Sequence, residues 1–388
     1  MERNEAVTRA VDESRDEILA FLARLVERNS YTHDKSGVDA VAEMVAAEMP
    51  AGFEHETIPN EQYGNHHRFL LVQKSGLPIV LAGHLDTLCP PDKSFNCMTE
   101  QGEKLIGPGV NDMKGGDTVL IWALKILERC GLLDDLSVVC IFNGDEEVGS
   151  PTSRSIFQGM KGKASRAFVF EGGGVGGTVV TTRKGVVRYR LSIQGKPAHF
   201  GCMKERKISA LLEAAHKVLS LEGLNEPDGS LVANVGRIEG GLAANKVAES
   251  ASLDFEARYW TPEVEQRALK AVEDIVAAAD VPGCELNLAE LSYRPPLQPS
   301  EESMQLFHHI QDLAGALGQS VSEEKRGGVS DANWLAHAGV PTLDGLGPIG
   351  DLDFTPEEYI LKDTLFQRVE LTAHLLASLA NQSGDASS

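Results

Sequence analysis

The sequence predicts an α/β protein with a mostly parallel sheet, helices on both faces of it, and an inserted smaller α+β domain. Three observations support this fold class. Short, almost continuous apolar runs at 77–82, 136–142 and 166–170 are typical of buried parallel strands. An amphipathic helical pattern at 117–129 separates the first two runs. After residue 184 the pattern changes to alternating apolar and polar residues, which is typical of an antiparallel sheet.

The remaining elements follow from hydrophobic periodicity. Helices are expected at 5–28, 37–49, 207–222, 262–279, 301–317 and 362–380, and further strands at 186–194, 253–260, 285–292 and 341–343. The breaker Arg294-Pro295-Pro296 ends the alternating region. We therefore expect one domain built from 1–183 and 297–388, with a second domain inserted at 184–296.

Charge and composition exclude several classes of function. The 388 residues have a net charge of −21, so nucleic acids and anionic membranes should be repelled. No apolar run reaches the roughly eighteen residues that a membrane span needs. The six cysteines form no CxxC pair, which favours reduced thiols over a disulfide framework. We expect a soluble, cytoplasmic protein.

Acidic side chains and one histidine follow the predicted strands. In α/β sheets, ligand sites gather at the carboxyl ends of the strands. This rule selects His84, Asp86, Glu146, Glu147 and Glu171, and Asp112 joins them from a glycine-rich loop before a helix. Any one of these acids alone is most simply a solvated loop residue. As a set they would repel one another unless a cation compensates, and mixed imidazole and carboxylate ligands suit zinc.

The adjacent pair Glu146-Glu147 suggests two different roles, metal binding and proton transfer. Neighbouring residues at a strand end point in different directions, so one can bind a metal while the other faces a water molecule. A metal lowers the pKa of its water to ~7, and a nearby carboxylate can accept the proton.

Several motifs occur in a characteristic order. They are GHLDT (83–87), GVNDMKGG (109–116), GDEEVGS (144–150), EGG (171–173), GKPAHFG (195–201), GGLAAN ending at Asn245, and GGVSDAN (327–333). In order and spacing they resemble the co-catalytic zinc metallopeptidase family, which includes glutamate carboxypeptidases, aminoacylases, acetylornithine deacetylase and succinyl-diaminopimelate desuccinylase. The resemblance covers essentially the whole chain.

The resemblance implies a metal centre with two zinc ions. The implied ligands are His84 and Glu171 for one ion, Glu147 for the other, and Asp112 bridging both. Glu146 is the implied general base, and Asp86 the implied partner that orients His84. Cobalt or manganese would be tolerated by such ligands.

The inserted domain, by the same resemblance, is a lid and a dimerisation domain. His199 would reach the site of a partner subunit in a homodimer and stabilise the oxyanion. Asn245 and Arg258 would contact the substrate carbonyl and carboxylate, with help from the Gly327-Gly328 backbone. Without the resemblance, His199 is an ordinary loop histidine, and Arg258 could equally pair with a carboxylate of its own domain.

One position departs from the family pattern. The family usually has a further histidine ligand shortly before a Thr/Ser-Pro-Asp/Glu-Glu-Tyr stretch, and Phe354 stands there in this sequence. Asp351 and Asp353 are candidate replacements, with Asp353 the closer, and the second site could also be lost. The number of metal ions, one or two, stays open at this stage.

Other motifs are decoys or missing. Gly172, Gly174 and Gly177 form a G-x-G-x-x-G pattern, but β-prone residues follow it where a nucleotide site needs a helix. The sequence contains neither G-x-S-x-G nor a P-loop motif. We expect a zinc-dependent amidohydrolase that cleaves a peptide-like amide next to a free carboxylate. The alternative is a metal-binding or regulatory relative with impaired catalysis, against which the retained Glu146 argues.

Overall fold

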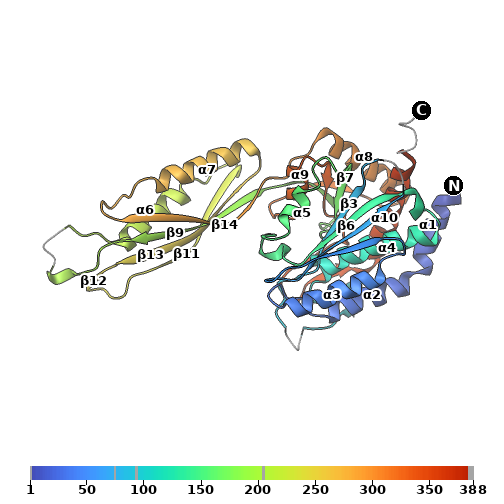
Figure 1. Ribbon diagram of the computed structural model, residues 1–388, viewed down its shortest axis with the longest axis horizontal. Helices are drawn as coiled ribbons and strands as arrows, with labels where there is room; N and C mark the ends of the chain where they lie inside the picture. The colour runs from blue at the N-terminus through green and yellow to red at the C-terminus, as the bar shows by residue number, and fades with distance from the viewer. Residues whose placement is uncertain (1, 74–75, 92–94, 203–205, 383–388) are drawn as a thin grey trace. The chain divides into compact units, whose positions relative to one another are not determined.

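The computed structural model describes residues 2–73, 76–91, 95–202 and 206–382, which form two compact units (Figure 1). Unit 1 contains the chain up to Thr181, Pro299–Lys325, and the chain from Ser330 onwards. Unit 2 contains Thr182–Gln298 together with Arg326–Val329. The sequence patterns did not indicate that 326–329 joins this unit.

Unit 1 is built on a six-stranded mixed sheet. Its strand order is β1 (Glu54–Ile58), β2 (His66–Val72), β6 (Ser137–Asn143), β3 (Ile79–His84), β7 (Arg166–Val169) and β16 (Thr342–Leu343). The pairs β6–β3, β3–β7 and β7–β16 are parallel, and β1 and β2 add an antiparallel edge. The α/β class is confirmed, and helices lie on both faces of the sheet (Figure 1).

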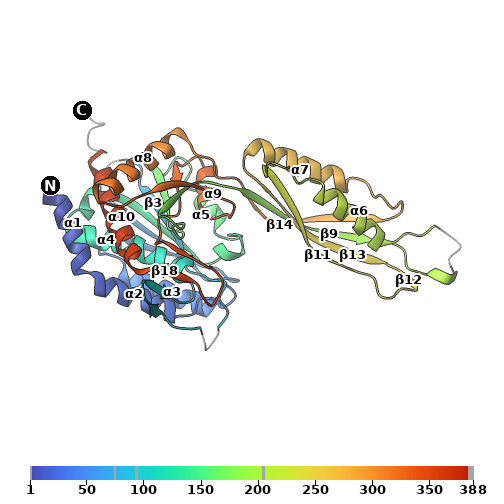
Figure 2. The ribbon, with the colours of Figure 1, turned by 180° about the vertical axis from the view of Figure 1, so that it is seen from behind.

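Eight α-helices belong to the described part of unit 1. They are α1 (Glu2–Glu13), α2 (Arg15–Glu27), α3 (Lys35–Glu48), α4 (Gly115–Arg129), α5 (Arg154–Gln158), α8 (Glu301–Ala316), α9 (Ala332–His337) and α10 (Lys362–Gln382). Figure 2 shows α10 and α4 on the side of the unit turned away in Figure 1. The buried core of the unit includes Trp122 of α4, Phe142 of β6 and Phe168 of β7.

Smaller elements complete the unit. A four-stranded sheet joins β17 (Gly350–Asp351), β18 (Tyr359–Leu361), β5 (Lys104–Ile106) and β4 (Thr99–Gln101), and β8 (Thr178–Arg183) pairs with β15 (Ser322–Arg326). Short turns occur at η1 (Val110–Lys114), η2 (Leu133–Asp135) and η3 (Glu146–Val148). Every helix within the described ranges falls short of the length and hydrophobicity that a bilayer crossing needs.

One local expectation was wrong, and two strands were missed. The single helix expected at 5–28 is broken at Ser14, whose hydroxyl donates to the carbonyl oxygen of Ala10 at 2.6 Å. Such local bonds compete with helix continuation. Strands β1 and β2 were not expected, because β1 is mostly exposed and β2 begins with the polar run His66-His67-Arg68.

Unit 2 is an antiparallel sheet covered on one face by two helices. The strand order is β11 (Leu231–Gly240), β13 (Ser250–Tyr259), β9 (Gly185–Gln194) and β14 (Glu285–Arg294). Burial alternates residue by residue along β13, and the apolar side packs on α6 (Ala210–Glu222) and α7 (Pro262–Val276). A small ribbon of β10 (Ala198–His199) and β12 (Lys246–Val247) and the turn η4 (Phe200–Cys202) complete the unit.

The buried His67 of β2, paired with the exposed His55 of β1, predicts how stability depends on pH. Burial and the neighbouring His55 lower the pKa of His67 to about 4. His55 Nε2 and His67 Nδ1 lie 2.9 Å apart. A lowered histidine pKa means that this contribution to stability is complete above pH 6.5 and is lost as the pH falls towards 4. At about 1.4 kcal/mol per pKa unit, the loss is at most roughly 3 kcal/mol.

The substitution His67→Gln should therefore flatten the dependence of the free energy of unfolding on pH between 6.5 and 4. Urea denaturation at a series of pH values measures this slope, with the same substitution at the exposed His308 as control. Equal slopes for the wild type and His67→Gln would contradict the prediction.

Candidate metal centre

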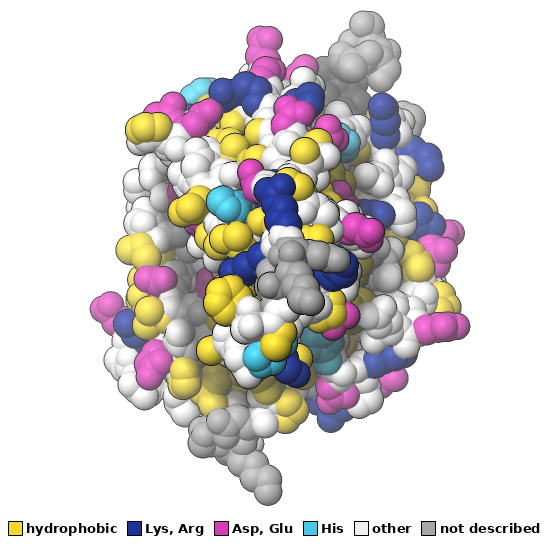
Figure 3. Space-filling view, turned by 90° about the vertical axis from the view of Figure 1, so that its left-hand side faces the viewer, with side chains coloured by type: hydrophobic (Ala, Val, Ile, Leu, Met, Phe, Trp, Pro, Cys, Tyr) yellow, Lys and Arg dark blue, Asp and Glu magenta, His cyan; other side chains and the backbone are white. Residues whose placement is uncertain are grey.

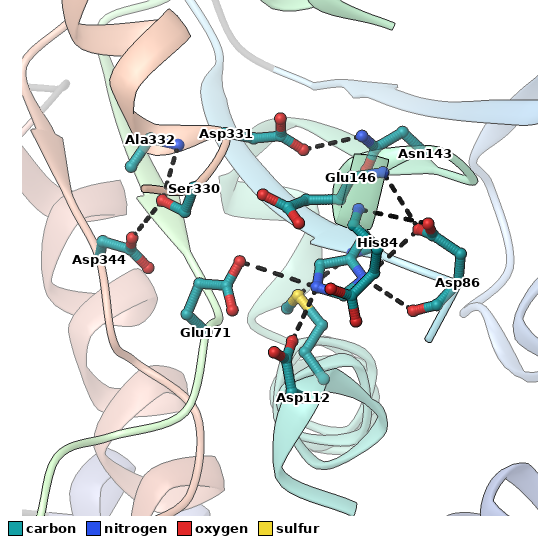
Figure 4. Close-up of polar contacts among 12 residues, drawn as sticks. His84, Asp86, Asp112, Asn143, Glu146, Glu171, Ser330, Asp331, Ala332 and Asp344 are labelled. Carbon is teal, nitrogen blue, oxygen red and sulfur yellow. Dashed lines mark hydrogen bonds and ion pairs between the residues drawn. The ribbon is translucent and has the colours of Figure 1, made fainter. Parts of the chain in front are cut away.

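The carboxyl ends of three parallel strands meet at one edge of the sheet in unit 1. His84 is the last residue of β3 and lies opposite Asn143, the last residue of β6. Glu171 follows β7, which pairs with β3 on the other side. Because parallel strands end at the same edge, residues 84, 143 and 171 come together (Figure 4).

Asp112 reaches the same place from the turn before α4. The helix begins so close to β7 that a Cβ atom on Gly116 would lie 1.7 Å from the carbonyl oxygen of Phe170. Only glycine permits this approach. The turn itself is held by Glu358, which accepts hydrogen bonds from the backbone N–H groups of Gly109, Asn111 and Asp112 at 2.8–3.0 Å. The Asp112–Met113 peptide bond is cis.

The resulting cluster has the composition of a metal site. His84 Nε2 lies 3.0 Å from Asp112 Oδ1 and 3.8 Å from Glu171 Oε1. One ligand atom each from His84, Asp112 and Glu147 lie within 4.8 Å of one another. The structure thus brings together four of the side chains that the sequence nominated as metal ligands, and Glu146 extends into the same region (Figure 4).

The tautomer of His84 suits a ligand. Nδ1 lies 2.9 Å from the carbonyl oxygen of Asp86, which can only accept, so Nδ1 carries the hydrogen. Nε2 faces the carboxylates, and on losing its proton when a metal binds it would offer its lone pair to that ion. A histidine whose second ring nitrogen is fixed by a hydrogen bond in this way is the usual arrangement at metal centres.

The electrostatics of the cluster call for a cation. Burial, followed by the charge of Asp112, raises the pKa of Glu147 and of Glu171 well above the ordinary value. Burial alone would lower the pKa of His84, but its contacts with Asp112, Asp86 and Glu171 raise it well above the ordinary value. Glu147 Oε1 is buried without a hydrogen-bond partner. Crowded carboxylates with an unsatisfied oxygen fit a divalent cation, which would supply the missing positive charge.

Asp86 makes further contacts besides the expected one with His84. Its carboxylate is 3.5 Å from His84 Nδ1, and it accepts the backbone N–H groups of Glu146 at 3.2 Å and Glu147 at 3.3 Å. Thr32 Oγ1 also donates to it at 2.9 Å. The completely buried Asp86 therefore fixes the turn that presents the two glutamates, in addition to lying beside His84.

A second buried carboxylate holds the far end of that turn, and sequence reasoning missed it. Asp145 accepts hydrogen bonds from the backbone N–H and hydroxyl groups of both Thr152 and Ser153. Asn143 donates to Asp331 at 2.8 Å, which ties the end of β6 to the start of α9 (Figure 4). Both aspartates lie inside motifs already noted, so motif membership was the available signal.

Asp353 is linked by a hydrogen bond to Asn111, the neighbour in sequence of Asp112 in the candidate metal cluster. Asn111 Nδ2 donates to Asp353 Oδ1 at 2.6 Å, one residue before Asp112. Phe354 has a left-handed backbone (φ +65°) and a side chain that is 54% exposed. Asp351 is exposed, and its carboxylate accepts the backbone N–H of Leu352.

The remaining nominated residues lie in unit 2, in two places. His199 and Asn245 are neighbours, since β10 pairs with β12 and the N–H of Phe200 donates to the carbonyl of Asn245. Both are exposed and border the ribbon at the end of the unit. Arg258 and the Gly327-Gly328 segment form the second place, because Arg258 Nη1 donates to the carbonyl oxygen of Gly327 at 3.0 Å.

The chain is similar to known peptidases over most of its length. Residues 80–378 match the model of Peptidase family M20/M25/M40. Carboxypeptidase G2 from Pseudomonas sp. (strain RS-16) is 26% identical over 97% of this chain and 92% of its own length.

Two solved structures share the fold. A tripeptidase from Staphylococcus aureus has a TM-score of 0.78 at 21% identity and covers 95% of this chain and 99% of its own. The Bacillus subtilis YXEP protein, described as a dinuclear metal binding peptidase, has a TM-score of 0.68 at 15% identity and covers 95% and 99%.

These matches and the site define the class of protein as a metal-dependent hydrolase of peptide bonds. The chain belongs to Peptidase family M20/M25/M40. The family resemblance expected from the sequence motifs is thereby confirmed.

The contacts of Asp353 lead to a prediction about the second metal ion. If Asp353 supplies the missing ligand, Asp353→Ala should weaken that site by about tenfold or more while the first ion stays bound. Phe354→His should raise zinc affinity if the loop turns the imidazole inward. Titration with zinc, read by calorimetry and elemental analysis, measures both sites.

Asp351→Ala is the matched control, because it removes an aspartate from the same loop. Equal stoichiometry and affinity in the wild type, Asp353→Ala and Phe354→His would exclude a role for Asp353 as a ligand.

Proposed function

We propose that this protein is a zinc-dependent amidohydrolase that cleaves a peptide-like amide next to a free carboxylate. The observation that supports it most strongly is the buried to half-buried cluster of His84, Asp112, Glu147 and Glu171 beside Glu146. The substrate classes that fit are dipeptides, N-acyl amino acids and C-terminal glutamate conjugates.

In this proposal His84 and Glu171 would hold one zinc ion, Glu147 would hold the other, and Asp112 would serve both. Asp353 is our candidate for completing the second site. Bound zinc would polarise the scissile carbonyl and lower the pKa of a water molecule. Imidazole and carboxylate ligands also accept cobalt or manganese.

Glu146 is the proposed general base, which transfers a proton from the attacking water to the leaving amine. It is not needed as a ligand, and Asp86 holds its backbone beside that of Glu147. In the proposed reaction its carboxylate accepts a proton from the attacking water and returns it to the nitrogen of the leaving amine. Retention of this group supports a working enzyme over the alternative of an impaired relative.

Unit 2 supplies the proposed substrate contacts. Arg258 binds the free carboxylate of the substrate, Asn245 contacts its carbonyl oxygen, and the Gly328 backbone assists. His199 stabilises the negative charge that develops on that carbonyl oxygen. We propose a cytoplasmic location, since all six cysteines are free thiols.

Metal removal and two matched variants test the function. Strong chelator should abolish hydrolysis of a panel of N-acyl amino acids, and zinc, cobalt or manganese should restore it. Glu146→Gln keeps the shape of the side chain but removes the base, so turnover should fall by roughly two to four orders of magnitude with normal metal content. Glu147→Gln should instead lower the metal content. Hydrolysis that survives chelation, or a mild effect of Glu146→Gln, would contradict the proposal.

We also propose that the protein is a homodimer formed through unit 2. The exposed edge strand β11 and exposed apolar side chains, including Leu219 (74%) and Leu242 (87%), support an interface there. Hydrophobic and charged side chains are mixed on the end of the unit that carries β12 (Figure 3). The exposed His199 lies on this end, beside a groove of about 420 Å³.

Complementation between two inactive variants tests this assembly. In a mixed dimer of Glu146→Gln and His199→Ala subunits, one site has both an intact Glu146 and the partner's intact histidine. Mixing the two proteins should therefore restore part of the activity, with each variant alone as control. No recovery in subunits shown to exchange, or a monomeric mass in solution, would contradict the proposed dimer.

A further inference from the structure

The guanidinium group of Arg258 is fixed from two directions within unit 2. Its Nε donates to Glu256 Oε1 at 2.6 Å, and Nη2 reaches Glu256 Oε2 at 3.4 Å. Nη1 donates to the carbonyl oxygen of Gly327 at 3.0 Å. Glu256 and Arg258 are two residues apart on β13, so their side chains lie on the same face of the sheet. The orientation of this guanidinium is therefore set before any ligand binds.

Arg258 keeps donors for a ligand in spite of these bonds. A guanidinium has five N–H donors, and within the described residues three of those of Arg258 have partners. One N–H remains on each terminal nitrogen, and the side chain is 26% exposed. A carboxylate can accept from both terminal nitrogens at once, a geometry that a lysine could not offer.

Glu256 is itself held by a second arginine. Arg188 on β9 lies directly opposite Glu256, and its Nε donates to Glu256 Oε2 at 3.0 Å. Burial tends to raise the pKa of Glu256, but the bonds with Arg258 and Arg188 lower it below the ordinary value. Glu256 is thus a carboxylate between two guanidinium groups, and the three together keep an excess of one positive charge.

The neighbouring acid–arginine pair on β13 and β9 can be compared with Glu256 and Arg188. Asp254 on β13 lies opposite Arg190 on β9, and the two form paired hydrogen bonds of 2.7 and 2.8 Å. This pair repeats the acid-on-β13, arginine-on-β9 arrangement two residues further along. Asp254 also accepts from Arg237 Nη1 of β11 at 3.5 Å, so it too lies between two arginines, but no contact between Asp254 and Arg258 occurs in the described part of the chain.

We propose that Glu256 is a positioning residue that presents Arg258 to a free carboxylate on the substrate, and so sets the preference for acids over their amides. This inference rests on the proposed function for the identity of the ligand. An arginine that is ordered beforehand loses less side-chain entropy when it binds a carboxylate. Glu256 occupies Nε and leaves one N–H on each terminal nitrogen for the ligand.

Binding without turnover tests the proposal. The probes are N-acetyl-L-glutamate, which represents both N-acyl amino acids and glutamate conjugates, and the same compound with its α-carboxylate converted to a primary amide. Calorimetry on the full-length, zinc-loaded Glu146→Gln protein measures Kd, and the panel substrates measure KM and kcat in the otherwise wild-type protein.

Glu256→Ala should weaken binding of the acid about tenfold or more, because Arg258 loses its charge-assisted partner and its orientation. Binding of the amide should stay unchanged, and kcat should stay within about twofold, since Glu256 does not touch the reacting atoms. Glu256→Gln still accepts a hydrogen bond from Nε and should give an intermediate Kd. Asp254→Ala, the matched control, should change neither Kd.

Equal weakening of acid and amide, no weakening of either, or the same effect from Asp254→Ala would overturn the proposal. The intermediate Kd of Glu256→Gln decides the case if the alanine variant does not fold, and a wild-type Kd there also overturns it. A protein that prefers the acid through Glu256 but hydrolyses no panel substrate would retain this inference and reject the proposed function. A protein that hydrolyses the panel substrates but does not bind the acid more tightly than the amide would retain the proposed function and reject this inference.

Discussion

Mutual repulsion among buried carboxylates is the constraint on which the rest of the structure depends. Asp112, Glu147 and Glu171 converge on one histidine, and burial raises the pKa of Glu147 and of Glu171. His84 can carry one positive charge, which does not balance three carboxylates. A divalent cation would stabilise such a set in its ionised form, and the cluster is a possible site for one.

Strand ends and hydrogen-bonded turns hold these carboxylates close to one another. Parallel strands β3, β6 and β7 bring their ends to one edge, and Gly116 lets α4 start against that edge. Buried acids then hold the intervening turns through backbone N–H groups: Asp86 holds the Glu146-Glu147 turn, and Glu358 holds the turn of Asp112. These acids are satisfied by hydrogen bonds with N–H donors and need no metal themselves. The centre therefore has an inner group of acids that needs a cation and an outer group that orients it.

Sequence alone predicted the α/β class, the central strands and the members of the metal cluster, because these depend on local hydrophobic pattern and on the rule for strand ends. The sequence did not predict the edge strand β1, because its exposed residues produce no hydrophobic pattern. The hydrogen bonds of Asp86 with two backbone N–H groups could not be predicted either, because the partners of a carboxylate depend on loop geometry. Arg258 pairs with an acid of its own sheet, which was one of the two expectations, and its contact with a substrate stays a prediction.

The central claim is that this cluster is a metal site, and anomalous diffraction from crystals of the zinc-loaded protein tests it most directly. Data collected on either side of the zinc absorption edge locate zinc independently of its surroundings. The account predicts at least one zinc peak at about 2.0–2.2 Å from His84 Nε2 and from carboxylate oxygens of Asp112 and Glu171. Zinc peaks only at other residues, or none at full zinc loading, would contradict it.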